Sequence, residues 1–382
     1  MAFINREIQS ELEHLSKHFQ IIVLTGPRQS GKTTLCKMVF KNYHYVNLED
    51  ASIRQHIELS PKEFLKQHSK GIIIDEAQRY PELFSYLQVV ADENKKAQFV
   101  LTGSSNFSLM EKVTQSLAGR AATLTLLPFS LKELGRRIKT INTDTLIING
   151  GYPAVWGKKT PPQDTSKNYY NTYIERDVRQ LLNIKDLSKF QLFIRLCAGR
   201  IGTEFNASAL SSEVGVSVHT IQHWVSVLEA SYIIFRLAPY YRNIGKRLIK
   251  TPKLYFCDTA LVCFLLGIEN EKQLATHPLR GGLFENLIVL EFLKRRFNAG
   301  KLSNLFYYRD KSQHEIDIIC ENGNDIDAFE IKSAKHFHRD FFNNIHYLRR
   351  IMTDNLVSTC LIYDGDEETR SKENGIINFR NI

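Results

Sequence analysis

The chain has 382 residues, of which 43% are hydrophobic and 24% charged, so its composition excludes an intrinsically disordered protein and its length suggests two or three domains. The formal net charge of +9 and the pI near 9.1 fit an anionic partner. No apolar run approaches the roughly 18–20 residues of a membrane span, and the N-terminus is charged where a signal peptide is apolar, so we expect a cytoplasmic protein with no membrane partner.

The first 130 residues alternate short apolar runs with stretches of helical periodicity. The apolar runs are Ile21–Leu24, Tyr45–Leu48, Gly71–Ile74, Phe99–Leu101 and Ala122–Leu126. Continuous apolar runs between helices are typical of parallel strands that are covered on both faces. We therefore predict an α/β domain built on a parallel sheet.

The segment after the first apolar run matches the phosphate-binding pattern GxxxxGK[ST] and lies between a strand and a helix, as the pattern requires. It consists of Gly26, Pro27, Arg28, Gln29, Ser30, Gly31, Lys32 and Thr33, followed by Thr34. Its two glycines allow the loop to wrap so that backbone N–H groups meet phosphate oxygens. We expect Lys32 to contact the β- and γ-phosphates and the Thr33 hydroxyl to bind Mg²⁺. The sequence therefore predicts a site for ATP and magnesium.

An acidic pair, Asp75–Glu76, ends the third apolar run. Asp75 is placed to hold Mg²⁺ through water, and Glu76 to polarise the attacking water. A P-loop phosphotransferase, the alternative reaction class, does not need the second acid, so the pair favours hydrolysis. The next strand leads into Ser104, Ser105 and Asn106, and we expect one of these to contact the γ-phosphate.

Eight segments together resemble one protein family. They are GPRQSGKTTL (26–35), IIIDEAQ (72–78), LTGSSN (101–106), LAGR (117–120), GGYPA (150–154), YIERDV (173–178), YFCDTAL (255–261) and LFENLIVLEF (283–292). In sequence and order they resemble a bacterial and archaeal group of AAA-superfamily P-loop ATPases. In that group the ATPase core precedes a winged helix and a C-terminal domain of long-unknown function that is related to PD-(D/E)xK nucleases.

The resemblance implies three domains. They are an AAA-like P-loop ATPase domain with a short lid (1–160), a mostly helical winged-helix domain (161–278) and an α+β nuclease-like domain (279–382). It also implies an arginine that completes the ATP site, often from a neighbouring subunit. We expect Arg120 in this role, with Arg28 as a weaker candidate, because a guanidinium neutralises transition-state charge. If Arg120 acts on a neighbouring copy, the protein must form a homo-oligomer.

The middle of the chain reads as a helix-turn-helix at Asn206–Leu228, with Gly215 in the turn and Ser217 as the cap of the second helix. That helix would expose His219, Thr220, Gln222 and His223, and strands at Ile233–Leu237 and Lys253–Phe256 would form a wing joined by Arg242, Lys246, Arg247 and Lys250. Between Lys167 and Lys253 there are 13 Lys and Arg against 6 Asp and Glu. We therefore expect DNA as the partner of this region, and a structural or protein-binding winged helix is the alternative.

The last third carries an acidic constellation: Glu285 on a predicted helix, Asp317 on a strand, and Glu330 and Lys332 on the next strand. In a hairpin, Asp317 and Glu330 can meet on one side and hold a divalent metal, while Lys332 orients or deprotonates a water. The constellation resembles the core of PD-(D/E)xK nucleases, in which some branches add a helix acid at the position of Glu285. The alternative is that these acids are ordinary surface charges.

Taken together, the sequence predicts an ATPase whose nucleotide cycle controls a DNA-binding winged helix and a nuclease-like domain. A different class of function is also compatible with the sequence. In that alternative the protein is a nucleotide-gated regulator or scaffold, and its C-terminal domain binds partners without cleaving DNA.

Overall fold

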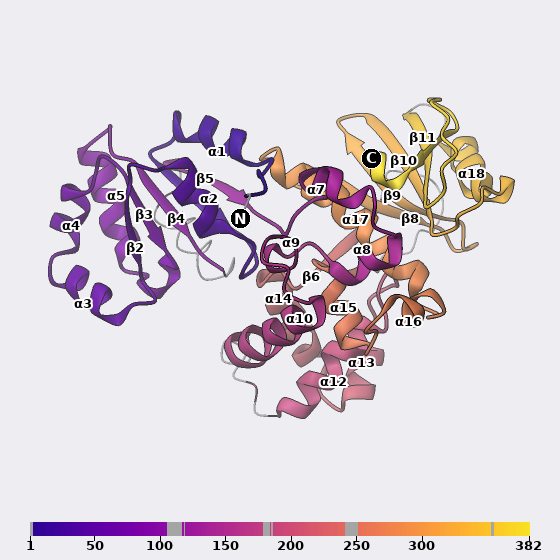
Figure 1. The fold of residues 1–382 in the computed structure, drawn as a ribbon, viewed down its shortest axis with the longest axis horizontal. Coiled ribbons are helices and arrows are strands. Elements are labelled where there is room, and N and C mark those ends of the chain that lie inside the picture. Colours follow the sequence, from indigo (N-terminus) through magenta and orange to yellow (C-terminus); the bar gives the residue numbers. More distant parts are fainter. Residues whose placement is uncertain are drawn as a thin grey trace.

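The computed structural model describes residues 3–104, 117, 119–178, 184, 186–240, 251–352 and 355–382, without the side chains of 176 and 177. The predicted residues Ser105, Asn106, Arg242, Lys246, Arg247 and Lys250 lie outside these ranges. In Figure 1 the N-terminal sheet and the C-terminal sheet lie at opposite ends of the molecule, and most of the helices from the middle of the chain lie between and below them.

The N-terminal sheet is parallel throughout, as the continuous apolar runs predicted. Its strands are β1 (Ile21–Thr25), β2 (His44–Asn47), β3 (Ile72–Asp75), β4 (Phe99–Thr102) and β5 (Ala121–Thr125), in the order β2-β3-β4-β1-β5. All five residues of β1 are buried because alternate side chains enter two cores, one on each face of the sheet.

Helices cover both faces of this sheet. They are α1 (Gln9–Ser16), α2 (Lys32–Val39), α3 (Ala51–Leu59), α4 (Pro61–Gln67) and α5 (Leu83–Glu93), with a 3-10 turn η1 (Ala77–Arg79) after β3. Helices α1 and α2 pack with the even-numbered side chains of β1, and α5 packs with the odd-numbered ones. The chain therefore reaches the loop between β1 and α2 from a strand that is buried on both sides.

The middle of the chain is mostly helical. It contains α7 (Leu131–Leu134), η2 (Gly135–Ile138), α8 (Thr143–Asn149), α9 (Pro153–Gly157), α10 (Pro162–Tyr169), the π-helix η3 (Tyr170–Val178), α12 (Leu187–Ala198), α13 (Ala207–Val214), α14 (Val218–Ala230), α15 (Thr259–Leu265) and α16 (Glu271–Ala275). The turn between α13 and α14 is confirmed, since Gly215 has φ +71° and the Ser217 hydroxyl accepts the N–H of Thr220 at 3.1 Å.

The C-terminal part is a seven-stranded mixed sheet in the order β12-β11-β10-β9-β8-β6-β7. Its strands are β6 (Ile234–Pro239), β7 (Lys253–Phe256), β8 (Leu305–Arg309), β9 (Glu315–Asn322), β10 (Asp325–Lys332), β11 (Leu356–Tyr363) and β12 (Gly375–Asn378). Helix α17 (Arg280–Asn298) packs on one face of this sheet and α18 (Asn343–Ile351) on the other, while η4 (Arg339–Phe342) and η5 (Phe379–Asn381) are short turns.

The strands β6 and β7 join the predicted middle and C-terminal domains. β6 pairs with β7 as an antiparallel ribbon and with β8 in parallel, where Ala238 lies opposite Phe306. One hydrophobic core also extends from Leu127 to Phe379, so side chains on both sides of residue 278 share it. The predicted boundaries at 160 and 278 therefore remain predictions about sequence units, because packing is continuous across them.

The helices of the described residues differ from membrane-spanning helices. None of them combines the length and the apolar character that crossing a membrane requires.

Candidate phosphate site and a second carboxylate cluster

The loop from Gly26 to Thr33 leaves the carboxyl end of β1 and enters α2. Gly26 has φ +142°, and a Cβ on it would lie 2.2 Å from the carbonyl oxygen of Leu126, so no larger residue fits. Gln29 and Gly31 also have positive φ, at +64° and +98°. Gly31 is the residue before the first turn of α2, whose first N–H groups have no partner within the helix. The loop therefore has the geometry of an anion-binding helix N-terminus.

Lys32 is almost fully buried in this loop, and its ammonium group donates to the carbonyl oxygens of Gly26 and Pro27 at 2.9 and 2.8 Å. Burial lowers the pKa of Lys32 to about 8, while the charges of Glu76 and Asp75 act in the opposite direction. The side chain thus lies inside the loop and keeps a charge that burial disfavours. An anion in the loop would stabilise that charge.

Asp75 ends β3 and accepts three hydroxyl groups. Thr33 donates to its carboxylate at 2.7 Å and Tyr45 at 2.9 Å, and Thr102 donates to its other oxygen. The structure therefore brings the predicted magnesium residues Thr33 and Asp75 into direct contact. Sequence reasoning missed Tyr45 on β2 and Thr102 on β4. These strands lie on either side of β3, and because parallel strands end at the same edge of a sheet, their side chains could have been expected near Asp75.

Glu76 follows Asp75 with φ +54°, an uncommon conformation for a residue other than glycine. Its carboxylate accepts from the side-chain amide of Gln78 and from the Ser104 hydroxyl at 3.2 Å. The carbonyl of Ser104 in turn accepts the hydroxyl of Tyr173, at 3.2 Å, from the π-helix of the middle part. Glu76 therefore lies beside Ser104, one of the residues expected to contact the γ-phosphate, and Ser104 in turn contacts Tyr173 of the helical region.

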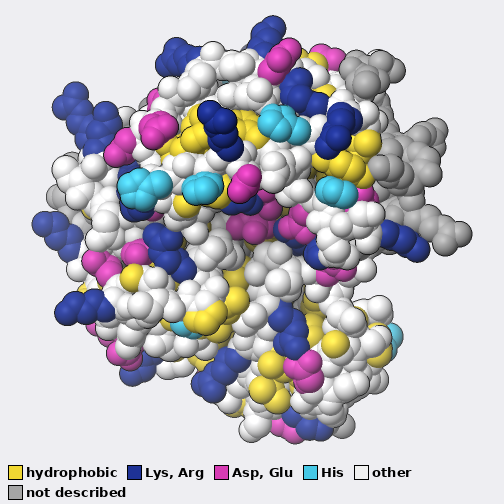
Figure 2. Space-filling model, turned by 90° about the vertical axis from the view of Figure 1, so that its right-hand side faces the viewer, with side chains coloured by type: hydrophobic (Ala, Val, Ile, Leu, Met, Phe, Trp, Pro, Cys, Tyr) yellow, Lys and Arg dark blue, Asp and Glu magenta, His cyan; other side chains and the backbone are white. Residues whose placement is uncertain are grey.

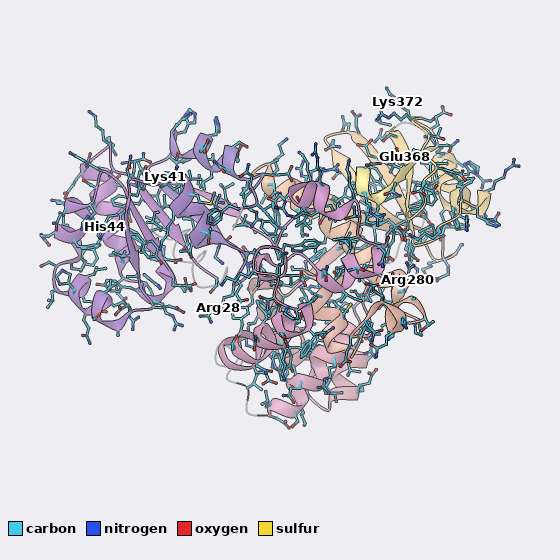
Figure 3. All side chains as sticks on the ribbon, viewed as in Figure 1. Arg28, Lys41, His44, Arg280, Glu368 and Lys372 are labelled. Atoms are coloured by element: carbon cyan, nitrogen blue, oxygen red, sulfur yellow. The ribbon has the colours of Figure 1, made fainter. Side chains whose placement is uncertain are left out.

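The two predicted arginines lie at different places. Arg28 pairs with Glu49 at 2.8 Å and lies 5.9 Å above the ring of Tyr173, and Figure 3 shows it on the side of the N-terminal part that faces the helices. Arg120 makes two hydrogen bonds of 2.9 Å to Asp92 and precedes β5, which starts beside the first residue of β1. It therefore lies one strand length, about 16 Å, from the phosphate loop, and within one chain it does not reach that loop.

An apolar cavity of about 200 Å³ adjoins the loop at Ser30 and Gly31. It is formed by Phe3, Ile4, Phe129 and Pro153 together with the first two turns of α2, including Thr34 and Leu35. Sequence reasoning did not identify this cavity. Pro153, in the GGYPA segment, was noted in the sequence, but its position beside the phosphate loop could not be predicted from the sequence.

The C-terminal constellation is partly assembled. Asp317 on β9 accepts the N–H of Ile331 at 2.7 Å, and on β10 Lys332 donates to Glu330 at 2.6 Å. Burial and the charge of Glu330 raise the pKa of Asp317, and burial raises the pKa of Glu330. Glu285 on α17 instead accepts from Lys253 at 3.0 Å and from Tyr255 at 2.5 Å.

The side chains of Asp317, Glu330 and Glu285 are not arranged as a three-ligand metal site. Over the described ranges, no group of three His, Cys, Asp or Glu side chains is arranged to hold a metal ion. One oxygen of Glu330 is nevertheless buried with no hydrogen-bond partner among the described residues. Figure 2 shows the face of the C-terminal part, where acidic side chains lie near the centre and Lys, Arg and His side chains surround them.

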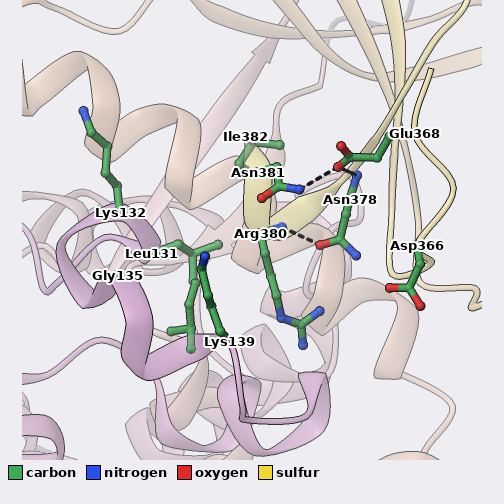
Figure 4. Close-up of a pocket in the computed structure, with 11 residues that line it drawn as sticks. Leu131, Lys132, Gly135, Lys139, Asp366, Glu368, Asn378, Arg380, Asn381 and Ile382 are labelled. Carbon is green, nitrogen blue, oxygen red and sulfur yellow. Dashed lines mark hydrogen bonds between the residues drawn. The ribbon is translucent and has the colours of Figure 1, made fainter. Parts of the chain in front are cut away.

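A second hollow, of about 670 Å³, lies between η2 and the end of the chain (Figure 4). Lys132, Lys139 and Arg380 line it together with Asp366 and Glu368. Glu368 is already occupied, since it accepts from the side chain of Asn381 at 2.7 Å. None of the predicted site residues lines this hollow, so it is separate from both clusters described above.

Comparison with known proteins divides the chain into three matched regions. Residues 18–135 match an AAA domain, residues 140–272 match a domain of unknown function (DUF8612), and residues 280–382 match another (DUF4143). Relatives of similar extent include an uncharacterized protein of Mycobacterium tuberculosis, which is 29% identical over 87% of this chain and 74% of its own length. Another, from Methanocaldococcus jannaschii, is 26% identical over 83% of this chain and 74% of its own length.

Among solved structures, a Walker-type ATPase of Pyrococcus abyssi matches 69% of this chain and 96% of its own, at 13% identity and a TM-score of 0.48. The domain matches agree with the parallel sheet and with the position of the phosphate loop between β1 and α2. The chain therefore combines an AAA domain with two domains of unknown function, DUF8612 and DUF4143.

Proposed function

We propose that the chain binds ATP with Mg²⁺ and hydrolyses it at the loop formed by residues 26–33. The observation that carries the proposal is the 2.7 Å contact between Thr33, at the start of α2, and Asp75, at the end of β3. Magnesium prefers oxygen ligands and retains several waters, and this pair offers only oxygens. In this assignment Thr33 and Asp75 would hold the cation, which would neutralise phosphate charge.

Lys32 and Glu76 would perform the remaining chemistry. Lys32 now donates to two loop carbonyls, and in the ATP complex it would donate to phosphate oxygens, where its positive charge is favoured. Glu76 would orient the attacking water, since its carboxylate lies beside Ser104 at the edge of the sheet where β3 and β4 end. Phosphate transfer to a second substrate remains the alternative reaction.

The apolar cavity beside α2 is the proposed site of the base. Phe3, Ile4 and Phe129 offer apolar surface to a planar ring, and the cavity begins at Gly31 and Thr34, where the phosphate loop meets the helix. Pro153 closes it from the segment that follows the ATPase sheet. Nucleotide binding would therefore draw together the N-terminal segment, the phosphate loop and the start of the helical part.

We also propose that the nucleotide state is transmitted to the later parts of the chain. Tyr173 contacts the Ser104 carbonyl at 3.2 Å, and the Tyr232 hydroxyl lies 2.8 Å from the Thr25 hydroxyl, at the end of β1. On the other side, α17 is fixed next to the base cavity, because Lys294 donates to the carbonyl of Phe129 at 2.8 Å. These buried contacts support a coupling between hydrolysis and the position of the C-terminal sheet.

The test of hydrolysis is the substitution Glu76→Gln. The variant should bind ATP as the wild type does and release phosphate at least about 100-fold more slowly, because the amide cannot accept a proton from water. Glu58→Gln, an exposed glutamate on α3, is the matched control and should hydrolyse ATP normally. Wild-type phosphate release by Glu76→Gln would remove Glu76 from the mechanism.

Metal-dependent cleavage of DNA is a second candidate function, for the C-terminal part. It is supported by the pairing of Asp317 with Glu330 and by the buried Glu330 oxygen that lacks a partner among the described residues. The third predicted ligand does not fit this site as it stands, because Glu285 is bound to Lys253 and Tyr255. We therefore assign no catalytic step to a metal here.

The cleavage assay uses supercoiled and linear DNA with Mg²⁺ or Mn²⁺, with and without ATP. Loss of cleavage in both Asp317→Ala and Lys332→Ala would support a nuclease, and absence of cleavage in the wild type would favour the alternative, a partner-binding scaffold. Asp325→Ala, an exposed residue at the start of β10, is the matched control.

DNA binding by the helix-turn-helix is a related proposal. It is supported by the exposed His219, Gln222 and His223 on α14, although residues 206–228 contain no Lys or Arg. Binding that requires this helix should weaken in His219→Ala and should fall steeply with added salt. Salt-independent affinity would contradict an electrostatic contact with phosphates.

A further inference from the structure

Arg6 lies in the segment before α1, and its guanidinium is buried beside the phosphate loop. It donates to the carbonyl of Ser30 at 2.7 Å, to the carbonyl of Leu127 at 2.5 Å and to the carboxylate of Glu133 at 2.9 Å. The ring of Phe129 lies 4.8 Å from it. One side chain thus connects the phosphate loop with the chain that leaves the ATPase sheet.

The contact with Ser30 has a geometric consequence for Gly31. In a trans peptide the carbonyl of one residue and the N–H of the next point in opposite directions. Because Arg6 holds the Ser30 carbonyl on its own side, the N–H of Gly31 points away from Arg6. That N–H precedes the first turn of α2, where an anion binds to a phosphate loop. A cation on the carbonyl also polarises the peptide and makes its N–H a stronger donor.

Arg6 is fixed in this position and is not a mobile phosphate ligand. A buried charge needs a partner, and Glu133 provides it while also accepting the N–H groups of Glu7 and Ser130. Burial lowers the pKa of Arg6, and the charge and hydrogen bond of Glu133 raise it. The hydroxyl of Ser30 has no hydrogen-bond partner among the described residues, so its carbonyl is the group that Arg6 controls.

We propose that Arg6 is a positioning residue for the phosphate loop, which directs the N–H of Gly31 toward the nucleotide phosphates by holding the carbonyl of Ser30. The inference rests on the nucleotide site proposed above. It differs from that proposal in assigning part of the phosphate affinity to a residue that does not contact the nucleotide phosphates and that lies 20 or more positions before the loop.

The experiment compares the wild type with Arg6→Met and Arg6→Lys, and Arg136→Met, an exposed arginine on η2, is the matched control. A fluorescent ADP derivative is displaced by ADP, by tripolyphosphate and by adenosine, and the three affinities are compared. In Arg6→Met we expect roughly tenfold weaker binding of ADP and tripolyphosphate, a much smaller change for adenosine, whose cavity Arg6 also lines, and normal behaviour of Arg136→Met. Arg6→Lys keeps a charge for the Ser30 carbonyl and should recover part of the loss.

The outcomes separate the two proposals. If the wild type binds no nucleotide, the proposed function fails. If the wild type binds ADP and Arg6→Met binds it equally well, the positioning role fails alone. An equal loss for adenosine and for tripolyphosphate would assign Arg6 to general support of the fold and would also overturn the inference. Arg6→Lys keeps the test decisive if Arg6→Met does not fold, since its loss should be confined to the phosphate-bearing ligands.

Discussion

Asp75 and Asp317 are both buried carboxylates at sheet positions, and their surroundings differ in one respect. Asp75 accepts hydroxyl groups from three elements, α2, β2 and β4. Asp317 accepts one backbone N–H and faces Glu330, so its closest acidic neighbour disfavours its charge. The comparison teaches that donors from several elements prepare a carboxylate to face a cation. Burial beside a second carboxylate instead makes the charged form of a carboxylate less favourable.

The largest effects are expected when the same substitution, aspartate to asparagine, is made at both sites. Asp75→Asn should lower the ATPase rate at least about 100-fold and destabilise the fold by about 1–2 kcal/mol, because an amide accepts fewer of the three hydroxyls. Asp317→Asn should instead stabilise the fold at pH 8 by about 1–2 kcal/mol, because it removes one of two repelling charges. Phosphate release and thermal unfolding measure the two effects, with Asp325→Asn as the exposed control.

The pH dependence of stability tests the prediction for Asp317→Asn. The pKa of Asp317 is raised in the folded state, so between its unfolded and folded pKa values the folded state binds more protons. Wild-type stability should therefore fall as pH rises through that window, and the advantage of Asp317→Asn should shrink in acid. A stabilisation that is equal at pH 4 and pH 8 would contradict the repulsion between the two carboxylates.

A smaller effect sharpens the account of the phosphate site. Because the pKa of Lys32 in the nucleotide-free protein is lowered to about 8, the amine loses its proton above that pH and must regain it to bind phosphate. ATP affinity should be nearly constant from pH 6.5 to 7.5 and should fall up to about tenfold per pH unit above 8. Calorimetric titration in two buffers of different ionisation enthalpy measures the proton uptake, which should be absent below pH 7.

The smallest expected effect concerns the contact between the N-terminal part and the helical middle part of the chain. Tyr173→Phe removes the hydroxyl that donates to the carbonyl of Ser104 and keeps the ring beside Arg28. We expect ATP affinity to change less than about threefold, because the contact lies outside the phosphate loop. Hydrogen exchange of α14 should lose its response to ATP. An unchanged response would exclude this tyrosine from the coupling.

Local pattern in the sequence was sufficient to predict the elements that carry the phosphate site. The five strands of the N-terminal sheet, the loop 26–33 and the acid at the end of β3 follow from apolar runs and from a motif whose residues are neighbours in sequence. The contact of Thr33 with Asp75 also follows, because β1 and β3 end at the same edge of a parallel sheet.

Contacts between distant segments could not be predicted in this way. Nothing local shows that β6 pairs with β8, or that Arg6 reaches the carbonyl of Ser30. Glu285 lies near enough to Asp317 for its charge to raise the pKa of that carboxyl, but its hydrogen bonds go to Lys253 and Tyr255, which come from the ribbon that joins the middle and C-terminal parts of the chain. These positions depend on how whole elements pack, which no single stretch of sequence encodes.

The central claim is that the loop 26–33 binds ATP with magnesium, and calorimetric titration tests it most directly. Mg²⁺ and ATP are titrated into the wild type, into Lys32→Ala and into Lys41→Ala, whose lysine is exposed beyond α2 (Figure 3). The account predicts binding to the wild type and to Lys41→Ala, and at least about 100-fold weaker binding to Lys32→Ala, because the buried ammonium group is lost. Equal affinity of all three proteins, or no binding to the wild type, would contradict the assignment of this loop as the nucleotide site.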